Sequence, residues 1–269
     1  MDKQRLRIGL VQLRATPAKD ANLGKILQHI DSLGSSCDLV VFPEYCMGYP
    51  NGKLSREFVQ EIAEPLNGGF VKSVAEKSKT HGSTVVLPIF ERDAETVFNT
   101  SVIVTDGRVI GKYRKIHLFD AFGFRESEFF GHGTEMVLFS VRGITLGVIT
   151  CYELRFPELM RRQVLSGARA VIVPAGWVHG SLKEEQWQTL LMARAAENTS
   201  YVIGVGNAHE AFIGRSMVAD PLGIKILDLA HGERVGYSEI DDAMVTQVRE
   251  RIPVLRQALD VSGTPCRRL

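Results

Sequence analysis

Two short apolar runs, each ending at a proline, constrain the fold more than any other feature of the sequence. Residues 39–42 (LVVF) lie directly before Pro43, and residues 170–173 (AVIV) lie directly before Pro174. A continuous apolar run of this length, bounded by a helix breaker, is typical of a buried strand in a parallel sheet. Because a helical pattern precedes both runs, we expect strand–helix–strand units in both halves and a pseudo-repeated architecture.

The spacing of apolar residues predicts the other elements. Asp106-Gly107 separates two alternating segments and is a strong hairpin signal. Residues 117–135 show no regular period and are expected to form a long loop, which in a compact domain is often functional. The predicted strands are 6–13, 39–42, 84–89, 97–104, 109–113, 144–150, 170–173, 201–205, 216–219, 224–229 and 236–240, and the predicted helices are 22–33, 56–63, 70–80, 157–165, 183–198 and 241–251. Since helices alternate with strands while hairpins interleave, the pattern favours two mixed sheets with outer helices over one doubly wound sheet.

The composition excludes several classes of protein. The 32 Lys+Arg residues nearly balance the 31 Asp+Glu residues, so the basic excess of a nucleic-acid-binding protein is missing. A hydrophobic fraction of 45% excludes an intrinsically disordered chain. No apolar run approaches the ~18 residues of a membrane span, and no Pro/Gly/Ser-rich linker divides the chain. We therefore expect one domain over residues 1–269, with a polar tail from about residue 253 and with neither a nucleic acid nor a membrane as partner.

The cysteines and the first residues of the sequence indicate the compartment. The cysteines are Cys37, Cys46, Cys151 and Cys266. They show no CxxC spacing and no histidine pair at the distances of a zinc site. The apolar stretch 8–13 is interrupted by Gln12 and is too short and too polar for a secretory signal. The expectation is a cytoplasmic protein with free thiols and without a metal or other cofactor.

Cys151 is the first candidate for chemistry. It directly follows the apolar strand 144–150 and precedes a helix that is expected to begin near Pro157. Reactive groups in α/β folds are often presented at such strand ends, and a helix N-terminus or a nearby cation lowers the pKa of a thiol. The position is compatible with a catalytic thiolate, and also with a small buried hydrophobe, which is the commoner fate of a lone cysteine.

Two charged residues occupy comparable positions. Glu44 follows the buried strand 39–42 through Pro43, where partial desolvation raises the pKa of a carboxyl group toward that of a general base. Lys115 follows the second strand of the predicted hairpin, where a lysine could stabilise a developing oxyanion. Taken singly, each is also explained as a solvent-exposed loop residue.

Three segments that contain these residues resemble the motifs of a known family. VVFPEY, YRKIHLF and TCYELRFPE, in this order, resemble the motifs of the nitrilase superfamily of carbon–nitrogen hydrolases. The resemblance extends over nearly the whole chain, from RIGLVQL to GRSMVADPLG. Within the superfamily, the chain is most similar to the branch that contains omega-amidase and deaminated glutathione amidase. The resemblance implies an α/β fold of the αββα sandwich type, a homodimer or higher homo-oligomer, and hydrolysis of a non-peptide C–N bond.

The resemblance also implies a Glu–Lys–Cys triad. Glu44 matches the glutamate of the first motif, Lys115 the lysine of the second, and Cys151 the nucleophile of the third. In the implied reaction, Glu44 accepts the thiol proton and Cys151 attacks the carbonyl carbon of an amide. Ammonia or an amine departs and leaves a thioester, which water then hydrolyses with the help of the same glutamate.

A supporting glutamate and an oxyanion-binding group complete the implied site. The family has a further glutamate on the loop before the cysteine motif, where Glu126 and Glu128 are both candidates. Counting back from Gly133, which matches a family glycine, favours Glu126. This side chain would lie between Lys115 and the substrate, and the backbone N–H of Tyr152 would join the lysine in stabilising the oxyanion.

Two residues are candidates for binding the substrate. Arg155 could bind a substrate carboxylate in a bidentate way, or form a structural ion pair with Glu158. Trp177 could line the pocket, or pack in the core or in an interface. Tyr45 and Trp187 are expected to be ordinary packing residues.

The favoured substrate is a small linear amide that carries a carboxylate. An N-carbamoyl compound or a nitrile is an alternative of the same class. The N-carbamoyl amino acid hydrolases of the superfamily, however, have two adjacent arginines where this chain has Leu154 before Arg155. A protein that keeps the fold but binds without turnover is an alternative of a different class, and the intact Glu44, Lys115 and Cys151 argue against it.

Overall fold

The two proline-terminated runs form strands inside two different sheets. In the computed structural model, which describes residues 4–258, the first run is β2 (Leu39–Val41) and the second is β10 (Ala170–Ala175). Each of these strands is hydrogen-bonded on both sides to a parallel neighbour. Parallel neighbours and two covered faces explain why both runs are apolar without alternation.

Each of the two sheets contains six strands. The first sheet consists of β14 (Arg234–Asp241), β1 (Arg5–Gln12), β2, β3 (Thr84–Asp93), β4 (Thr96–Thr105) and β5 (Arg108–Arg114), in this order. The second consists of β13 (Lys225–Asp228), β12 (Met217–Ala219), β11 (Tyr201–Gly206), β10, β9 (Ile144–Val148) and β8 (Leu138–Val141). Both sheets place three parallel strands inside antiparallel outer strands, as the predicted pseudo-repeat requires.

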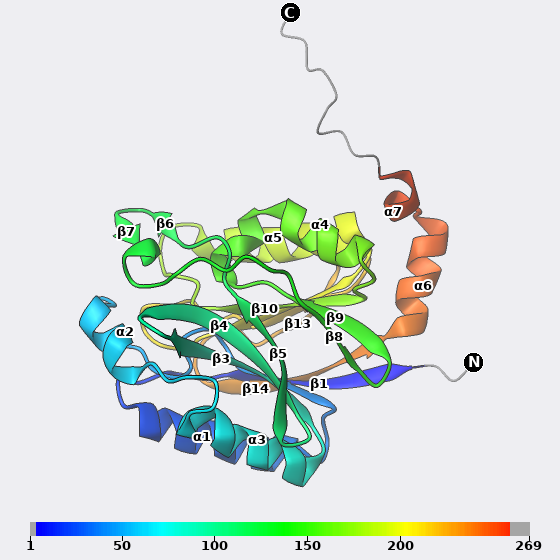
Figure 1. Cartoon of the computed structure of the whole chain (residues 1–269). Coiled ribbons are helices and arrows are strands. Elements are labelled where there is room, and N and C mark those ends of the chain that lie inside the picture. The colour runs from blue at the N-terminus through cyan, green and yellow to red at the C-terminus, as the bar shows by residue number, and fades with distance from the viewer. Residues whose placement is uncertain (1–3, 259–269) are drawn as a thin grey trace, which may run out of the picture.

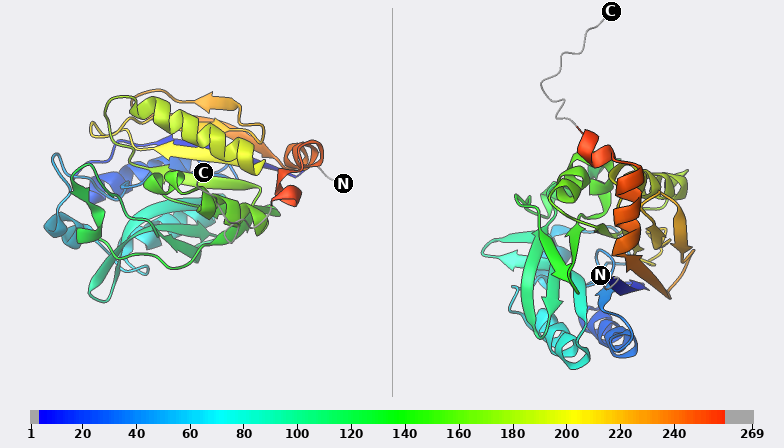
Figure 2. Two further views of the ribbon diagram at one scale, coloured as in Figure 1. Left: turned by 90° about the horizontal axis from the view of Figure 1, so that it is seen from above. Right: turned by 90° about the vertical axis from the view of Figure 1, so that its right-hand side faces the viewer.

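Helices cover the outer faces of both sheets (Figure 1). The first sheet carries α1 (Lys19–Leu33) and α3 (Gly69–His81), and the second carries α4 (Pro157–Leu165) and α5 (Lys183–Asn198). The remaining helices are α2 (Arg56–Ile62), α6 (Asp242–Arg251) and α7 (Val254–Gln257). Figure 2 shows α4 and α5 lying above the second sheet and α1 and α3 below the first. The predicted αββα sandwich of two mixed sheets is therefore confirmed.

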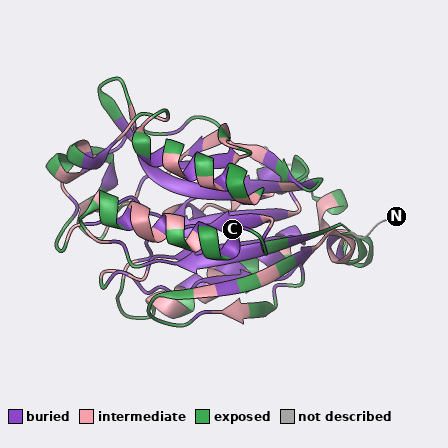
Figure 3. Cartoon of the chain, turned by 90° about the horizontal axis from the view of Figure 1, so that it is seen from below, coloured by how far each residue is buried: buried purple, intermediate pink, exposed green. Residues whose placement is uncertain are grey.

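The alternation of side chains along each strand builds three apolar layers. In β2, Leu39 and Val41 point into the layer between the two sheets, whereas Val40 points toward α1 and α3. In β10, Ile172 points into the same central layer, whereas Val171 points toward α4 and α5. Strands β2 and β10 are consequently buried on both faces, and the covering helices expose their outer sides (Figure 3).

The structure differs from the predicted elements in three places. The predicted loop 117–135 contains a small hairpin of β6 (Asp120–Ala121) and β7 (Phe124–Arg125), followed by the 3₁₀ turn η1 (Glu126–Glu128). These elements are too short to produce a recognisable period. The sequence analysis did not predict strand β8. Helix α7 lies within the predicted tail. Most of this tail, including Cys266, falls outside the described residues. The expectation of one domain over 1–269 stays a prediction. In the described part of the chain, no helix is long and apolar enough to cross a membrane.

A buried glutamine joins the two sheets. Gln12, at the end of β1, donates from Nε2 to the carbonyl oxygens of Ala230 and Gly232 at 2.8 Å and 2.7 Å. Its Oε1 accepts from the backbone N–H of Ser216, directly before β12, at 2.6 Å. The same polar residue that interrupts the first apolar run of the sequence therefore forms hydrogen bonds with three backbone groups, one of which is the buried N–H of Ser216.

Replacing Gln12 with leucine should destabilise the sandwich, because the buried N–H of Ser216 would lose its side-chain acceptor and the carbonyls of Ala230 and Gly232 would each lose a donor. We expect Gln12→Leu to lower the free energy of unfolding by about 1–3 kcal/mol, measured by urea denaturation. The control is Gln28→Leu, since Gln28 is exposed on α1 and the substitution is chemically the same. Equal effects of the two substitutions would contradict a joining role for Gln12.

Candidate active site

The four candidate catalytic side chains gather where strands of both sheets end. Glu44 lies three residues after β2, Lys115 directly follows β5, and Cys151 follows β9 as the first residue of the 3₁₀ helix η2 (Cys151–Arg155). Glu126 is the first residue of η1. The structure thus brings together the four side chains that the sequence analysis named, from segments more than 100 residues apart.

The centre of the site is a buried cluster of one lysine and two glutamates. Lys115 Nζ lies 2.9 Å from Glu44 Oε1 and 2.8 Å from Glu126 Oε2, and all three side chains are almost inaccessible to solvent. Asn99 of β4 donates its amide to both carboxylates, at 2.8 Å to Glu44 and 2.9 Å to Glu126. The second oxygen of Glu44 accepts the backbone N–H of Gly176 at 2.7 Å. Each charge is therefore paired and hydrogen-bonded, as burial requires.

The charge of Lys115 is maintained by its neighbours. Burial alone would lower the pKa of this amine, but the carboxylates of Glu126 and Glu44 outweigh burial and raise the pKa above its usual value. The side chain is consequently an ammonium group at neutral pH, with its charge held inside the protein.

The structure places Glu126, and not Glu128, beside Lys115. Glu126 Oε2 also accepts the backbone N–H of Phe119 at 2.7 Å, and its Oε1 accepts the hydroxyl of Tyr45 at 3.2 Å. Glu128 is instead exposed and lies 3.6 Å from Arg125. Glu126 therefore fixes the predicted loop to the buried cluster.

The backbone at Cys151 is strained. Its φ is 49°, in the left-handed region that non-glycine residues rarely occupy, and its side chain is buried. Such strain clusters at functional sites, and in this protein it also occurs at hairpin turns such as Ala94 and Arg142. Burial raises the pKa of the Cys151 thiol well above its usual value, and the negative charge of Glu44 adds to this, against the opposing effect of Lys115.

The predicted lowering of the thiol pKa was therefore wrong. The prediction considered cations and helix ends and could not include the desolvation of Cys151 or the nearby carboxylate. The thiol is protonated in the resting site, so attack by sulfur requires a base that removes the proton.

Glu153 is a buried residue to which the sequence analysis assigned no role. Its Oε2 accepts the backbone N–H of Thr150 at 2.7 Å, and its Oε1 accepts those of Ile116 and His117 at 2.8 Å and 3.0 Å. The hydroxyl of Tyr113 donates to the same carboxylate at 2.7 Å. Glu153 thus ties the segment that carries the lysine to the turn that carries the cysteine. The spacing Thr-Cys-Tyr-Glu, a capping box, was the signal that could have identified it.

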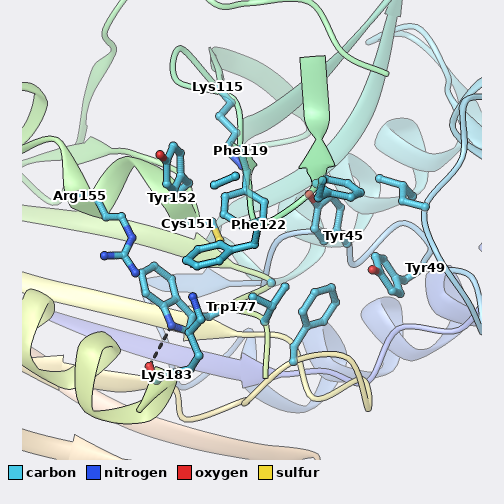
Figure 4. Close-up of a pocket in the computed structure, with 16 residues that line it drawn as sticks. Tyr45, Tyr49, Lys115, Phe119, Phe122, Cys151, Tyr152, Arg155, Trp177 and Lys183 are labelled. Carbon is cyan, nitrogen blue, oxygen red and sulfur yellow. Dashed lines mark hydrogen bonds between the residues drawn. The ribbon is translucent and has the colours of Figure 1, made fainter. Parts of the chain in front are cut away.

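The site opens into a cavity of about 220 Å³ with an aromatic lining (Figure 4). Tyr45, Tyr49, Phe119 and Tyr152 line it together with Trp177. The expectation that Tyr45 only packs was incomplete, since its hydroxyl contacts the buried cluster and its ring borders the cavity.

The two predicted substrate-binding residues lie on one wall of the cavity. Arg155 donates to Gln186 Oε1 at 2.8 Å, and its guanidinium carbon lies 5.1 Å from the ring centroid of Trp177. The indole N–H of Trp177 donates to the carbonyl of Lys183 at 3.0 Å. The considered ion pair between Arg155 and Glu158 is not among the salt bridges of residues 4–258. Trp187, as expected, is fully buried in the core.

The motifs, the fold and this site agree with one family. Residues 7–250 match the family described as carbon-nitrogen hydrolase. The chain therefore belongs to the carbon-nitrogen hydrolases, and so to the nitrilase superfamily.

Particular relatives lie in the branch that the sequence analysis named. The chain is 37% identical to deaminated glutathione amidase of Escherichia coli O157:H7 over 195 residues, which cover 72% of this chain and 74% of the relative. It is 30% identical to omega-amidase NIT3 of Saccharomyces cerevisiae over 276 residues, covering 94% and 93% of the two chains. It is also similar to the crystal structure of Saccharomyces cerevisiae Nit3, described as a member of branch 10 of the nitrilase superfamily, with a TM-score of 0.82, 28% identity, and coverage of 93% and 95%.

Removing the negative charge of Glu44 should lower the pKa of the Cys151 thiol, because a carboxylate disfavours a neighbouring thiolate. In Glu44→Gln, the pH midpoint for alkylation of Cys151 by iodoacetamide should therefore shift downward. Mass spectrometry of the alkylated peptide gives the rate at each pH. Alkylation of Cys37 should keep its pH dependence in the same variant, because Asp38 and Arg7, and not Glu44, act on its charge. An unchanged or higher midpoint for Cys151 would contradict this account of its environment.

The pKa of Glu153 should make the effect of its replacement depend on pH. Burial raises the pKa of this carboxyl group to about 6, although the hydrogen bonds from His117, Thr150 and Tyr113 oppose the rise. A carboxyl group whose pKa is raised on folding stabilises the protein at low pH and loses that contribution as the pH rises through the folded pKa. Since glutamine does not titrate, the free energy of unfolding of Glu153→Gln relative to wild type should increase by about 2 kcal/mol from pH 4.5 to pH 7.

Urea denaturation of both proteins across this pH range measures the difference. Tyr113→Phe removes a donor that favours the charged carboxylate, so in that background the change should occur at higher pH. A difference between wild type and Glu153→Gln that is constant with pH would refute the raised pKa.

Proposed function

We propose that this protein is an amidase that hydrolyses a small linear amide bearing a carboxylate, through a thioester at Cys151. The observation that carries the proposal is the buried cluster in which Lys115 Nζ bridges Glu44 and Glu126 at 2.9 Å and 2.8 Å, beside a strained cysteine that borders a cavity. A nucleophile, a base and an oxyanion-stabilising cation in one dry site are the groups that amide hydrolysis needs.

In the first step, the amide carbon of the substrate lies over the sulfur of Cys151. Glu44 removes the thiol proton as the S–C bond forms, which a thiol of raised pKa requires. The oxygen of the tetrahedral intermediate is stabilised by the ammonium group of Lys115 and the backbone N–H of Tyr152. Glu44 then gives its proton to the nitrogen as the C–N bond breaks, and ammonia or an amine leaves a thioester.

In the second step, water enters the position that the leaving group has vacated. Glu44 removes a proton from this water as oxygen attacks the thioester carbon, and the second tetrahedral intermediate uses the same oxyanion-stabilising groups. Collapse of this intermediate breaks the S–C bond, and the sulfur recovers the proton from Glu44. Glu126 remains a carboxylate throughout and holds Lys115 in place through its 2.8 Å contact. The cycle therefore needs one base and no histidine.

The nature of the substrate follows from the cavity and from the relatives. A volume of about 220 Å³ suits a short chain, and Arg155 at its wall offers a guanidinium group to a carboxylate. Relatives named omega-amidase and deaminated glutathione amidase support amides as the substrate class. Leu154, where the N-carbamoyl hydrolases have an arginine, is fully buried in the core, which disfavours the carbamoyl alternative.

Two further properties belong to the proposal. The three described cysteines are free thiols, in keeping with a reducing, cytoplasmic compartment. A homodimer or higher homo-oligomer is expected from the superfamily, and light scattering at micromolar concentration measures it.

The test is ammonia release from a panel of primary amides, deaminated peptides, N-carbamoyl amino acids and nitriles. We expect the wild-type protein to favour amides with a carboxylate.

Cys151→Ala should reduce the rate by at least about 10³-fold, since it removes the nucleophile and little volume. Acid quenching followed by mass spectrometry should detect the acyl group on the Cys151 peptide of wild type only. The control is Cys46→Ala, because the sulfur of Cys46 contacts the carbonyl of Pro88 and does not border the cavity. Activity retained in Cys151→Ala would refute the covalent mechanism, and a catalytically silent protein would turn over no member of the panel.

A further inference from the structure

A second cation, Lys183, shares the cavity with Arg155. Lys183 is the first residue of α5 and lines the cavity, and its carbonyl is held by the indole of Trp177. The same indole ring lies beneath the guanidinium group of Arg155. The backbone of Lys183 and the guanidinium group of Arg155 therefore both contact Trp177, and both residues border one cavity, as Figure 4 shows.

The ammonium group of Lys183 rests on an aromatic ring and not on a carboxylate. Its Nζ lies 4.0 Å from the ring centroid of Phe122, an exposed residue between β6 and β7. Within residues 4–258, neither Lys183 nor Arg155 belongs to a salt bridge. Most other half-buried cations of the chain do pair with acids, for example Lys19 with Glu64 at 2.6 Å.

The charges on this wall act on one another. Partial burial lowers the pKa of Lys183, and the positive charge of Arg155 lowers it further, whereas the Cys151 thiol has the opposite effect. Lys183 therefore lies close enough to Cys151 and Arg155 to interact electrostatically with both. Two like charges with no acid between them leave the wall with an excess of positive potential, which an anionic ligand would neutralise.

We propose that Lys183 determines specificity by binding, together with Arg155, the acidic end of the amide substrate. This inference rests on the proposed function and adds to it a second residue, Lys183, that binds the carboxylate of the substrate. The ammonium group lies on the ring of Phe122. A substrate carboxylate would replace this ring as the stronger partner of Lys183, since a charge-assisted hydrogen bond exceeds an exposed cation–π contact. Arg155 is already fixed by Gln186 and Trp177, so it supplies the rigid part of this anion site and Lys183 the adjustable part.

The experiment compares two amides of nearly equal size. Succinamic acid has one amide and one carboxylate, whereas succinamide has an amide at both ends and no charge. In Lys183→Met, which keeps the length of the side chain, the ratio of kcat/KM for succinamic acid to that for succinamide should fall by about tenfold, mainly through KM. Lys183→Arg should restore most of the ratio because it restores the charge. Lys72→Met, on the exposed side of α3, is the matched control and should leave the ratio unchanged.

A second measurement separates this inference from the proposed function. Calorimetric binding of succinamic acid to Cys151→Ala, with and without Lys183→Met, reports the anion site even if no turnover occurs. Absence of turnover of both amides by the wild-type protein would refute the proposed amidase. In that case, about tenfold weaker binding of succinamic acid to the double variant than to Cys151→Ala would still support Lys183 as an anion ligand. An equal loss for both amides in Lys183→Met, or binding that is independent of Lys183, would overturn the inference and leave the contact with Phe122 as a packing feature.

Discussion

The site depends on one ammonium group held between two carboxylates in a region without solvent. Burying Lys115, Glu44 and Glu126 together is tolerated only because every charge has partners, and those partners come from both sheets. Asn99 in the first sheet donates to both carboxylates, while the N–H of Gly176, which follows β10 of the second sheet, donates to Glu44. Together with Gln12, the cluster is therefore a polar connection between two sheets whose facing sides are mainly apolar.

This cluster explains why the cysteine is kept as a thiol. Near Glu44 and away from water, the thiolate of Cys151 is disfavoured, and its pKa is raised despite the presence of Lys115. Many thiol enzymes instead lower the pKa of the cysteine and keep a reactive thiolate at rest. In the proposed reaction, this protein activates sulfur only as the proton moves to Glu44, so nucleophilicity develops in the same step as the charge that Lys115 stabilises.

How much the sequence could predict depends on whether a feature is local. The strands around Leu39–Val41 and Ala170–Ala175, and the positions of Glu44 and Cys151 at strand ends, follow from apolar runs and the residues that end them. The contacts of Asn99 and Lys183 do not, because they arise from the register of β4 with its neighbours and from the packing of α5 against the cavity. The raised thiol pKa likewise needs the three-dimensional burial that no spacing of residues reveals.

The end of β10 couples the proposed chemistry to the proposed recognition of the substrate. Gly176 orients the base through its N–H, and the next residue, Trp177, supports Arg155 with its ring and holds the backbone of Lys183 with its indole N–H. A side chain at position 176 would have no room, since an added Cβ would lie 2.7 Å from the ring of Tyr45. Two consecutive residues at the end of one buried strand thus contact the proposed base and the proposed anion-binding wall. A carboxylate fixed at that wall would bring the amide at the other end of a short substrate to the sulfur with little freedom, which is the main requirement for attack within an enclosed site.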